Sequence, residues 1–319
     1  MTAPSDRPAV LTVAKLPPFY LDRVTASFNV LDRIHESDSA AFENAAPGIR
    51  AVTGGGESLV SRELMDKLPA LKIVSIMGVG YDRVDVAAAK ERGVVVTHTP
   101  DVLNDEVADT AMGLMLSIAR RIPQADRWVR EGKWESVGNM PLARKMSGTR
   151  LGIVGLGRIG NAIADRAKAF GMSIAYTSRT KKDTAYPYFA STKELAAHVD
   201  FLMVITPGGA GTKHLINAEV LQALGPKGYL VNVSRGSVVD EAALVDALQK
   251  GVIAGAALDV FEQEPKVPAS LRAMDNVVLT PHIGSATVQT RHAMADLAYR
   301  NLEAFFAGKA PFTPVPECR

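Results

Sequence analysis

Short apolar runs alternate with longer segments of helical periodicity along most of the chain. In the first hundred residues, the runs at 10–14, 49–53, 73–77 and 94–97 are typical of strands that are buried on both faces. Segments of helix length separate these runs. The alternation predicts repeated βα units around a parallel sheet.

A second series of strands begins near residue 150. Before it, the pattern predicts helices at 104–120 and 123–131, followed by an irregular segment at 132–147. Six apolar runs follow, at 151–154, 173–177, 201–205, 229–233, 254–258 and 277–280. Six strands with crossover connections are typical of a complete doubly wound dinucleotide-binding sheet.

The length of the chain, 319 residues, favours two domains, because single hydrophobic cores stop growing near about 250–300 residues. The segment at 287–308 has helical spacing but no strand partner, so we expect it to pack on the first domain. We therefore predict an α/β fold with two Rossmann-like domains. The first is a discontinuous, flavodoxin-like substrate domain at 1–100 and 287–319, and the second is a doubly wound, nucleotide-binding domain at 101–286.

Composition narrows the classes of function. The hydrophobic fraction is 47%, the charged fraction is 22% and the net charge is only +2, so a globular protein without a nucleic-acid partner is expected. The single cysteine, Cys318, forms no intrachain disulfide and is compatible with the cytoplasm. The N-terminus has no secretory pattern, and the apolar stretch at 108–119 is too short to span a membrane. No membrane partner is predicted.

A glycine motif lies at the first strand of the second series. Gly155, Gly157 and Gly160 follow the run at 151–154 and open a helical pattern at 161–170. Such glycines provide a tight turn, close approach of the backbone to a pyrophosphate, and packing of helix on strand. The strand before the motif and the helix after it favour dinucleotide binding over an incidental glycine-rich turn.

The segment at 176–182, Tyr-Thr-Ser-Arg-Thr-Lys-Lys, follows the second strand of this series. NAD-dependent enzymes commonly place an acid at this position to bind the ribose hydroxyls, but the first acid here is Asp183. Ser178, Arg179 and Thr180 instead suit a 2′-phosphate, which predicts NADP(H) as the cofactor. A solvated basic turn is the alternative.

Three side chains near the ends of later strands provide the groups that reduction of a 2-keto acid needs. Arg235 is a guanidinium suited to a carboxylate, and His282 is an acid for the developing alkoxide. Glu264 is a carboxylate that, when paired with His282, favours the imidazolium and should raise the pKa of that histidine. Taken singly, these residues have structural alternatives: a loop-capping arginine, a core or loop histidine and a surface carboxylate, of which the last is the strongest.

Asp259 also lies at a strand end. We expect it to accept a hydrogen bond from the nicotinamide carboxamide, with a loop-capping role as the alternative. Reduction is expected to weaken as the pH rises through the titration of the Glu264–His282 pair.

These segments together resemble the D-isomer-specific 2-hydroxyacid dehydrogenase family, and within it the glyoxylate/hydroxypyruvate and hydroxyphenylpyruvate reductases. The resemblance is carried by residues 155–160, 234–236, 259–261 with 264–265, and 281–285, and upstream by 78–85, 99–102 and 106–109. It covers nearly the whole chain. It implies a homodimer that uses NADPH to reduce a 2-keto acid of the glyoxylate/hydroxypyruvate type to the D-2-hydroxy acid.

The resemblance also implies roles for individual residues. Arg235 becomes the substrate anchor, His282 the proton donor and Glu264 its partner, while the backbone amides of Val79 and Gly80 bind the substrate carboxylate. No metal is predicted. The predicted cofactor-binding set comprises Gly155, Leu156, Gly157, Arg158, Ile159, Gly160, Ser178, Arg179, Thr180, Thr206, Pro207, Val233, Ser234, Asp259 and Ser285.

The substrate within this class stays open. Some glyoxylate/hydroxypyruvate reductases carry an aromatic residue shortly after a Gly-x-Trp, where this chain has Val137 after Trp134. The pocket is then wider, and phenylpyruvates, hydroxyphenylpyruvate and 2-ketogluconate are alternatives. Trp134 itself fits an interface or packing role better than a substrate contact. A non-catalytic nucleotide-sensing protein is a more distant alternative, because it needs neither the acid nor the anchor.

Overall fold

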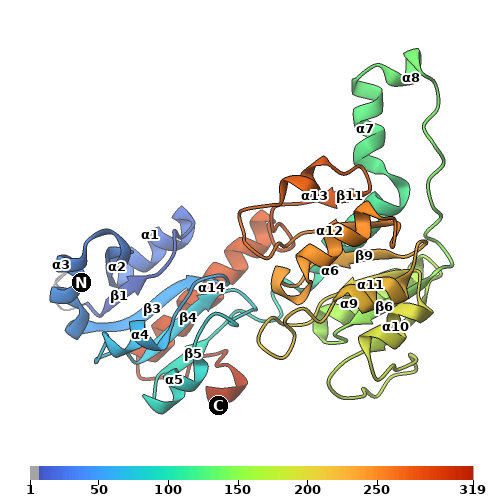
Figure 1. The fold of residues 1–319 in the computed structure, drawn as a ribbon. Coiled ribbons are helices and arrows are strands. Elements are labelled where there is room, and N and C mark those ends of the chain that lie inside the picture. Colours follow the sequence, from blue (N-terminus) through green and yellow to red (C-terminus); the bar gives the residue numbers. More distant parts are fainter. Residues whose placement is uncertain (1–6, 319) are drawn as a thin grey trace. The chain divides into compact units, whose positions relative to one another are not determined.

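The computed structural model describes residues 7–318, and these form two compact units. Unit 1 combines the chain up to Leu103 with the chain from Thr287 onward, and unit 2 comprises Asn104–Ala286. Each unit contains a parallel β-sheet with helices on its faces (Figure 1). The predicted fold class is confirmed. Each unit is described below by itself.

The sheet of unit 1 has the strand order β2-β1-β3-β4-β5, which is the flavodoxin-like order. All neighbouring strands pair in parallel. The interior strand β4 is buried along its whole length, whereas the edge strand β2 is at least partly exposed throughout. The sequence pattern did not predict β2 for this reason. The strands are β1 (Ala9–Thr12), β2 (Asn29–Asp32), β3 (Ile49–Gly55), β4 (Ile73–Met77) and β5 (Val95–Thr97).

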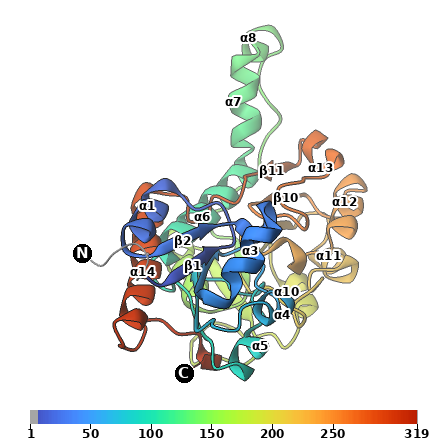
Figure 2. The same ribbon diagram turned by 90° about the vertical axis from the view of Figure 1, so that its left-hand side faces the viewer.

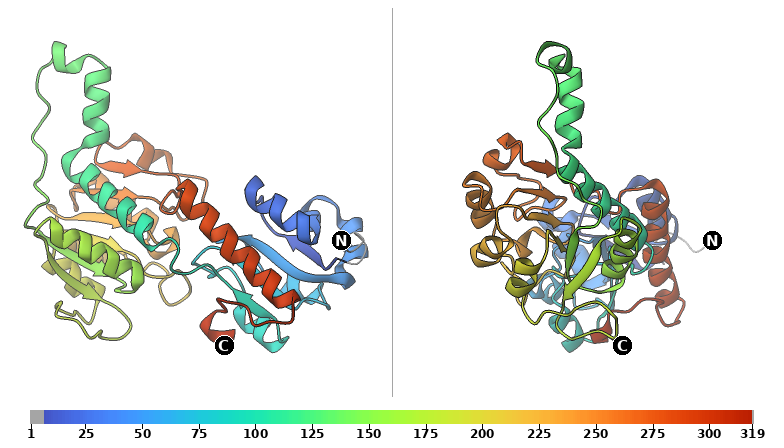
Figure 3. Two further views of the ribbon diagram at one scale, coloured as in Figure 1. Left: turned by 180° about the vertical axis from the view of Figure 1, so that it is seen from behind. Right: turned by 90° about the vertical axis from the view of Figure 1, so that its right-hand side faces the viewer.

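The C-terminal helix α14 (Val288–Phe306) returns to this first sheet. Ser75 of β4 donates a side-chain hydrogen bond of 3.0 Å to the carbonyl oxygen of Ala298, and α1 also packs against α14 (Figure 3, left). The remaining helices of unit 1 are α1 (Pro18–Ser27), α2 (Ile34–Ser37), α3 (Ser39–Ala45), η2 (Ala46–Gly48), α4 (Arg62–Asp66), α5 (Val86–Glu91) and η4 (Pro316–Cys318).

The sheet of unit 2 has six parallel strands in the order β11-β10-β9-β8-β6-β7. Beyond β7, Tyr188 forms an isolated parallel bridge to Tyr176. If this bridge counts as a shortened strand, the order becomes 3-2-1-4-5-6 with one further strand, which is the dinucleotide-binding order. The strands are β6 (Arg150–Val154), β7 (Ser173–Thr177), β8 (Phe201–Val204), β9 (Tyr229–Asn232), β10 (Gly255–Leu258) and β11 (Val277–Leu279).

Helices cover both faces of this sheet. Helices α6 and α9 pack together on one face, and α10, α11 and α12 pack in sequence on the other (Figures 1 and 3). The helices of unit 2 are α6 (Asn104–Arg120), α7 (Ile122–Arg130), α8 (Lys133–Ser136), α9 (Arg158–Ala169), α10 (Thr192–His198), α11 (Ala218–Leu224), η3 (Gly236–Val238), α12 (Glu241–Gln249) and α13 (Ala269–Ala273).

Helices α7 and α8 form an arm that extends from the rest of unit 2 (Figures 1 and 2). The predicted helix at 123–131 corresponds to α7, but α8 lies in the segment predicted to be irregular. The indole nitrogen of Trp128 donates to the carbonyl oxygen of Gly138 at 2.9 Å, which joins α7 to the segment after α8. Within residues 7–318, no helix combines the length and apolar character needed to cross a bilayer.

Candidate active site

The unit 2 residues of the predicted site all follow strands of a single parallel sheet. The carboxyl ends of these parallel strands meet at the same edge of the sheet, and this is the edge where ligands of doubly wound folds bind. Each of the six strands contributes. The loops after them carry Gly155–Gly160 after β6, Ser178–Thr180 after β7, Thr206 and Pro207 after β8, Val233, Ser234 and Arg235 after β9, Asp259 and Glu264 after β10, and His282 and Ser285 after β11.

The three glycines after β6 are each explained by the local geometry. Gly155 has φ of +104°, and a Cβ there would lie 2.9 Å from the carbonyl oxygen of Ile205. A Cβ on Gly160 would lie 2.5 Å from the carbonyl oxygen of Gly155, so the helix could not pack so closely on the turn. Gly157 is the N-cap of α9, and no described atom lies within 4 Å of a Cβ built on it. That open space beside a helix N-terminus fits a pyrophosphate.

The turn after β7 lies beside the glycine turn, because the amide of Gly155 donates to the carbonyl oxygen of Thr177 at 2.9 Å. The buried hydroxyl of Tyr176 organises this turn. It accepts a hydrogen bond from the amide of Lys182 at 2.7 Å and donates to the carbonyl oxygen of that residue at 3.2 Å. The side chain of Arg179 is exposed between these anchors. Tyr176 was not predicted as an organiser of this turn.

Arg235 lies in a loop that two neighbouring residues shape. The side-chain amide of Asn232 donates to the carbonyl oxygen of Arg235 at 3.0 Å, and its oxygen accepts from the amide and hydroxyl of Ser234. Gly236 packs directly against the next loop, since a Cβ there would lie 1.9 Å from the carbonyl oxygen of Phe261. The loops of Arg235 and Glu264 are therefore in contact. Sequence reasoning missed Asn232, although a polar residue inside the apolar run at 229–233 is a usable signal.

Glu264 and His282 form the predicted pair. The imidazole Nδ1 lies 2.8 Å from Oε2 of Glu264, and Oε1 accepts a hydrogen bond of 3.0 Å from the amide of Phe261. Burial of the Glu264 carboxyl acts to raise its pKa, but the hydrogen bond and charge of His282, the Phe261 amide and the charge of Arg235 outweigh burial and lower it. The carboxylate is therefore ionised and oriented beside the imidazole.

Asp259 organises the turn that carries His282. Its buried carboxylate accepts hydrogen bonds from the hydroxyl of Thr280 at 2.6 Å and from the amides of Ile283 and Gly284, each at 2.8 Å. Its carbonyl oxygen accepts from the amide of His282, which has a positive φ of 52°. Asp259 therefore makes the contacts of a loop-capping residue, which was the alternative to a role in cofactor binding. Its contact with a nicotinamide carboxamide stays a prediction.

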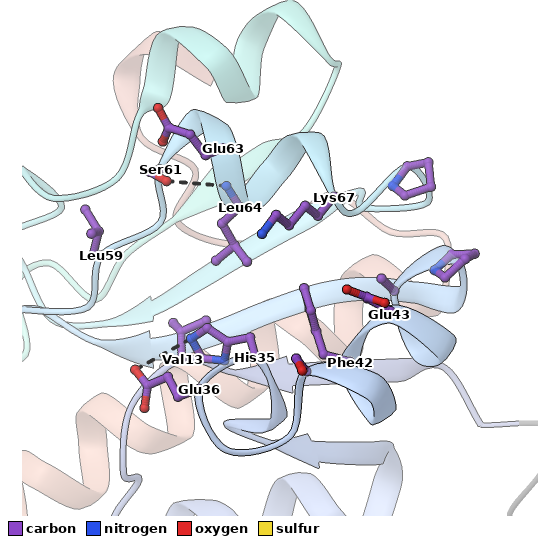
Figure 4. Close-up of a pocket in the computed structure, with 14 residues that line it drawn as sticks. Val13, His35, Glu36, Phe42, Glu43, Leu59, Ser61, Glu63, Leu64 and Lys67 are labelled. Carbon is purple, nitrogen blue, oxygen red and sulfur yellow. Dashed lines mark hydrogen bonds and ion pairs between the residues drawn. The ribbon is translucent and has the colours of Figure 1, made fainter.

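Val79 and Gly80, the predicted carboxylate-binding amides, lie in unit 1 in the loop after β4. Unit 1 also contains a hollow of about 810 Å³ between α3 and α4, with Phe42 and Leu64 on its walls (Figure 4). None of the predicted site residues lines this hollow. Within the described part of the chain, no cluster of His, Cys, Asp and Glu side chains is arranged to hold a metal ion.

Comparison with known proteins identifies the class of this site. Residues 112–284 match the model for the D-isomer specific 2-hydroxyacid dehydrogenase, NAD binding domain. The chain belongs to the D-isomer-specific 2-hydroxyacid dehydrogenase family. It is an oxidoreductase with the two Rossmann-like domains expected of that family, so the recognised resemblance is confirmed.

Individual relatives cover most of this dehydrogenase. It is 54% identical over 271 residues to a hydroxyphenylpyruvate reductase of Plectranthus scutellarioides, covering 85% of this chain and 86% of the relative. It is 42% identical to a 2-ketogluconate reductase of Gluconobacter oxydans, covering 98% and 99%. A solved structure of an NADPH-dependent glyoxylate/hydroxypyruvate reductase from Sinorhizobium meliloti, in complex with NADP and malonate, is 48% identical with a TM-score of 0.93, covering 98% of each chain.

Replacement of Glu264 by Gln tests the pair in this dehydrogenase. Gln keeps the shape but not the charge, so we expect kcat/KM for 2-keto acid reduction near neutral pH to fall roughly 10- to 100-fold. Because the carboxylate favours the protonated imidazole, the alkaline limb of the rate profile should move to lower pH. In the native protein, the lowered pKa of Glu264 keeps the pair intact until the pH falls below the usual range of a carboxyl.

The measurement is a pH profile of kcat/KM with NADPH and glyoxylate. Glu262→Gln is the matched control, because Glu262 lies in the same loop but pairs with His214 at 3.0 Å. Superimposable profiles for the two variants would contradict the role of Glu264.

Proposed function

We propose that this protein is an NADPH-dependent reductase that converts a 2-keto acid of the glyoxylate/hydroxypyruvate type to the D-2-hydroxy acid. The observation that carries the proposal is the hydrogen bond between Glu264 and His282 at the sheet edge that also bears Arg235 and the glycine turn. A bound nicotinamide cofactor supplies the hydride. The residues of the chain position the keto acid and deliver the proton.

His282 is proposed as the proton donor. Its Nδ1 lies 2.8 Å from Oε2 of Glu264, and we assign the donation of a proton to the ketone oxygen to the other ring nitrogen, Nε2. Asp259 and the amides it binds fix the turn around His282, so the imidazole is oriented before substrate arrives. Glu264 favours the protonated form of the imidazole, and it remains an ionised carboxylate throughout the reaction.

Arg235 is proposed as the substrate anchor. A planar guanidinium binds a carboxylate through two parallel hydrogen bonds and polarises a neighbouring carbonyl. This proposal is supported by the direct contact between the loop of Arg235 and the loop of Glu264, where a Cβ on Gly236 would lie 1.9 Å from the carbonyl oxygen of Phe261. The backbone amides of Val79 and Gly80 are proposed as further donors to the substrate carboxylate.

NADP is the proposed cofactor, held by the predicted set at the strand ends. The support is the open space at Gly157, the exposed Arg179 in the turn beside the glycine motif, and the NADP-bound relative from Sinorhizobium meliloti. A carboxylate at the position of Arg179 would repel a 2′-phosphate, whereas a guanidinium attracts it.

Hydroxyphenylpyruvate is the second candidate substrate. It is favoured by the 54% identity to a hydroxyphenylpyruvate reductase and by Val137, which is smaller than an aromatic residue. In an apolar pocket, one methylene more or less in the substrate changes the binding free energy of the transition state by only about 1–3 kcal/mol. A cytoplasmic location is also part of the proposal, because the chain has one cysteine.

A homodimer is proposed through the arm of α7 and α8. Several large apolar side chains are exposed on and after this arm: Val129 at 57%, Trp134 at 62%, Val137 at 69% and Leu142 at 100%. Contiguous exposed apolar side chains are typical of a protein interface. A second copy of the chain is the proposed partner, since symmetric pairing buries the same patch twice.

The proposed reaction is tested with a panel of 2-keto acids: glyoxylate, hydroxypyruvate, phenylpyruvate, hydroxyphenylpyruvate and 2-ketogluconate. We expect oxidation of NADPH, followed at its absorbance maximum, with at least one of them, because the anchor and acid suit all 2-keto acids. Acetone is the control, since it lacks the carboxylate. Binding of NADPH without turnover of any keto acid would instead support the nucleotide-sensing alternative.

Cofactor preference is tested by Arg179→Ala. Loss of a charge-assisted hydrogen bond should reduce the preference for NADPH over NADH by roughly 10- to 100-fold in kcat/KM. The rate with NADH should change little, because NADH has no 2′-phosphate. Lys250→Ala, which removes another exposed cation at the end of α12, is the control. Discrimination that stays unchanged in Arg179→Ala refutes the assignment.

The dimer is tested by the double variant Trp134→Ser, Leu142→Ser. Removal of two apolar side chains from the interface should shift the mass measured by light scattering from twice 34.0 kDa toward 34.0 kDa. Leu59→Ser, which alters an exposed apolar residue of unit 1, should leave the mass unchanged. A monomeric native protein, or an unaltered mass of the double variant, argues against this interface.

A further inference from the structure

Hydrogen bonds from residues 98 and 99 orient two successive peptide units in the loop of Val79 and Gly80. The carbonyl oxygen of Gly78 accepts a hydrogen bond of 2.8 Å from the amide of Thr99. That carbonyl belongs to the same peptide unit as the amide of Val79. Because the N–H and C=O of a trans peptide point in opposite directions, this bond turns the Val79 amide away from Thr99.

The next peptide unit is held from the same side. The carbonyl oxygen of Val79 lies 2.9 Å from Nδ1 of His98, the residue that precedes Thr99. A carbonyl oxygen only accepts, so the imidazole donates from Nδ1. This peptide unit contains the amide of Gly80, which is turned away from His98 in the same manner. The amides of Val79 and Gly80 therefore face one side together, and neither donates to any residue in the described part of the chain.

His98 is itself fixed by the C-terminal segment. Its amide donates to the carbonyl oxygen of Thr313 at 3.2 Å, and its carbonyl oxygen accepts from the hydroxyl of Thr313 at 2.6 Å. The side-chain amide of the fully buried Asn301 donates to that hydroxyl at 2.8 Å. The imidazole also packs edge-to-face on Tyr81, with ring centroids 5.2 Å apart.

The backbone of the loop cannot easily adopt another position. A Cβ on Gly78 would lie only 2.7 Å from the Cα of Gly56, so the two chain segments are in direct contact. The hydroxyl of Tyr81, which follows the loop, donates to the carboxylate of Glu317 at 3.2 Å. Two adjacent amides on a loop that is held in this way are suited to the two oxygens of a carboxylate.

We propose that His98 is a positioning residue, which aims the amides of Val79 and Gly80 at the carboxylate of the substrate. This inference rests on the proposed function, because it assigns the carboxylate-binding role of those amides. His98 does not touch the substrate. It acts through the carbonyl oxygen of Val79, so its loss weakens the binding of carboxylates more than it changes the chemical step.

Two substitutions distinguish the effect of the hydrogen bond from His98 to Val79 from the effect of the packing of His98 on Tyr81. In His98→Phe, the ring that packs on Tyr81 is kept and the donor is lost. In His98→Asn, the ring is lost, but the side-chain nitrogen occupies the place of Nδ1 and can donate. We expect His98→Phe to raise the KM for glyoxylate about 3- to 10-fold, with kcat within about twofold, and His98→Asn to resemble the native protein.

Two binding measurements accompany the kinetics. The Kd of malonate, measured by calorimetry on the NADPH-loaded protein, should rise in His98→Phe by the same factor as KM. The Kd of NADPH should be the same in all three proteins, because the cofactor set lies in unit 2. Thermal melts of both variants identify any general loss of folding.

The outcomes distinguish the two proposals. If the native protein binds malonate but reduces no 2-keto acid, the proposed function fails, and the malonate series still decides the role of His98. If the native protein reduces keto acids, but KM and malonate affinity are unchanged in His98→Phe, the inference about His98 is overturned. It is also overturned if His98→Asn weakens binding as much as His98→Phe does.

Discussion

The parallel alignment of the six strands in unit 2 is the constraint on which the candidate site depends. It places the carboxyl end of every strand at one edge, so side chains separated by more than a hundred positions in the chain belong to one set of loops. The switch in direction between β6 and β8 opens that edge beside the glycine turn. Without this alignment, Arg235, Glu264 and His282 would be unrelated surface residues.

Close backbone contacts then turn a set of neighbouring loops into a defined geometry. Gly236 allows its loop to contact the carbonyl group of Phe261, and Gly284 lies close enough for its amide to reach Asp259. These contacts couple the loops that carry Arg235, Glu264 and His282. The site is therefore organised by main-chain hydrogen bonds and glycines, while the reactive side chains are few.

Sequence periodicity predicted the fold class and ten of the eleven strands, because most strands are buried on both faces. It missed β2, whose residues are polar and partly exposed at the sheet edge. The candidate site residues Arg235, Glu264 and His282 could be predicted from motifs. Asn232, Tyr176 and His98 could not, because their roles arise from contacts with main-chain groups, which leave no periodic signal in the sequence.

The turn after β7 is held by Tyr176 through both its side chain and its main chain. The hydroxyl of Tyr176 closes the turn at Lys182, and the main chain of Tyr176 bonds to Pro187 and Phe189. Positions 178–181 thus lie between main-chain contacts of residues 176, 182, 187 and 189, and within the turn the hydroxyl of Ser178 donates to the carbonyl oxygen of Thr180 at 2.7 Å. The edge of the sheet is therefore held by contacts that a substitution at Arg179 or Lys181 leaves in place, whichever nucleotide this turn binds.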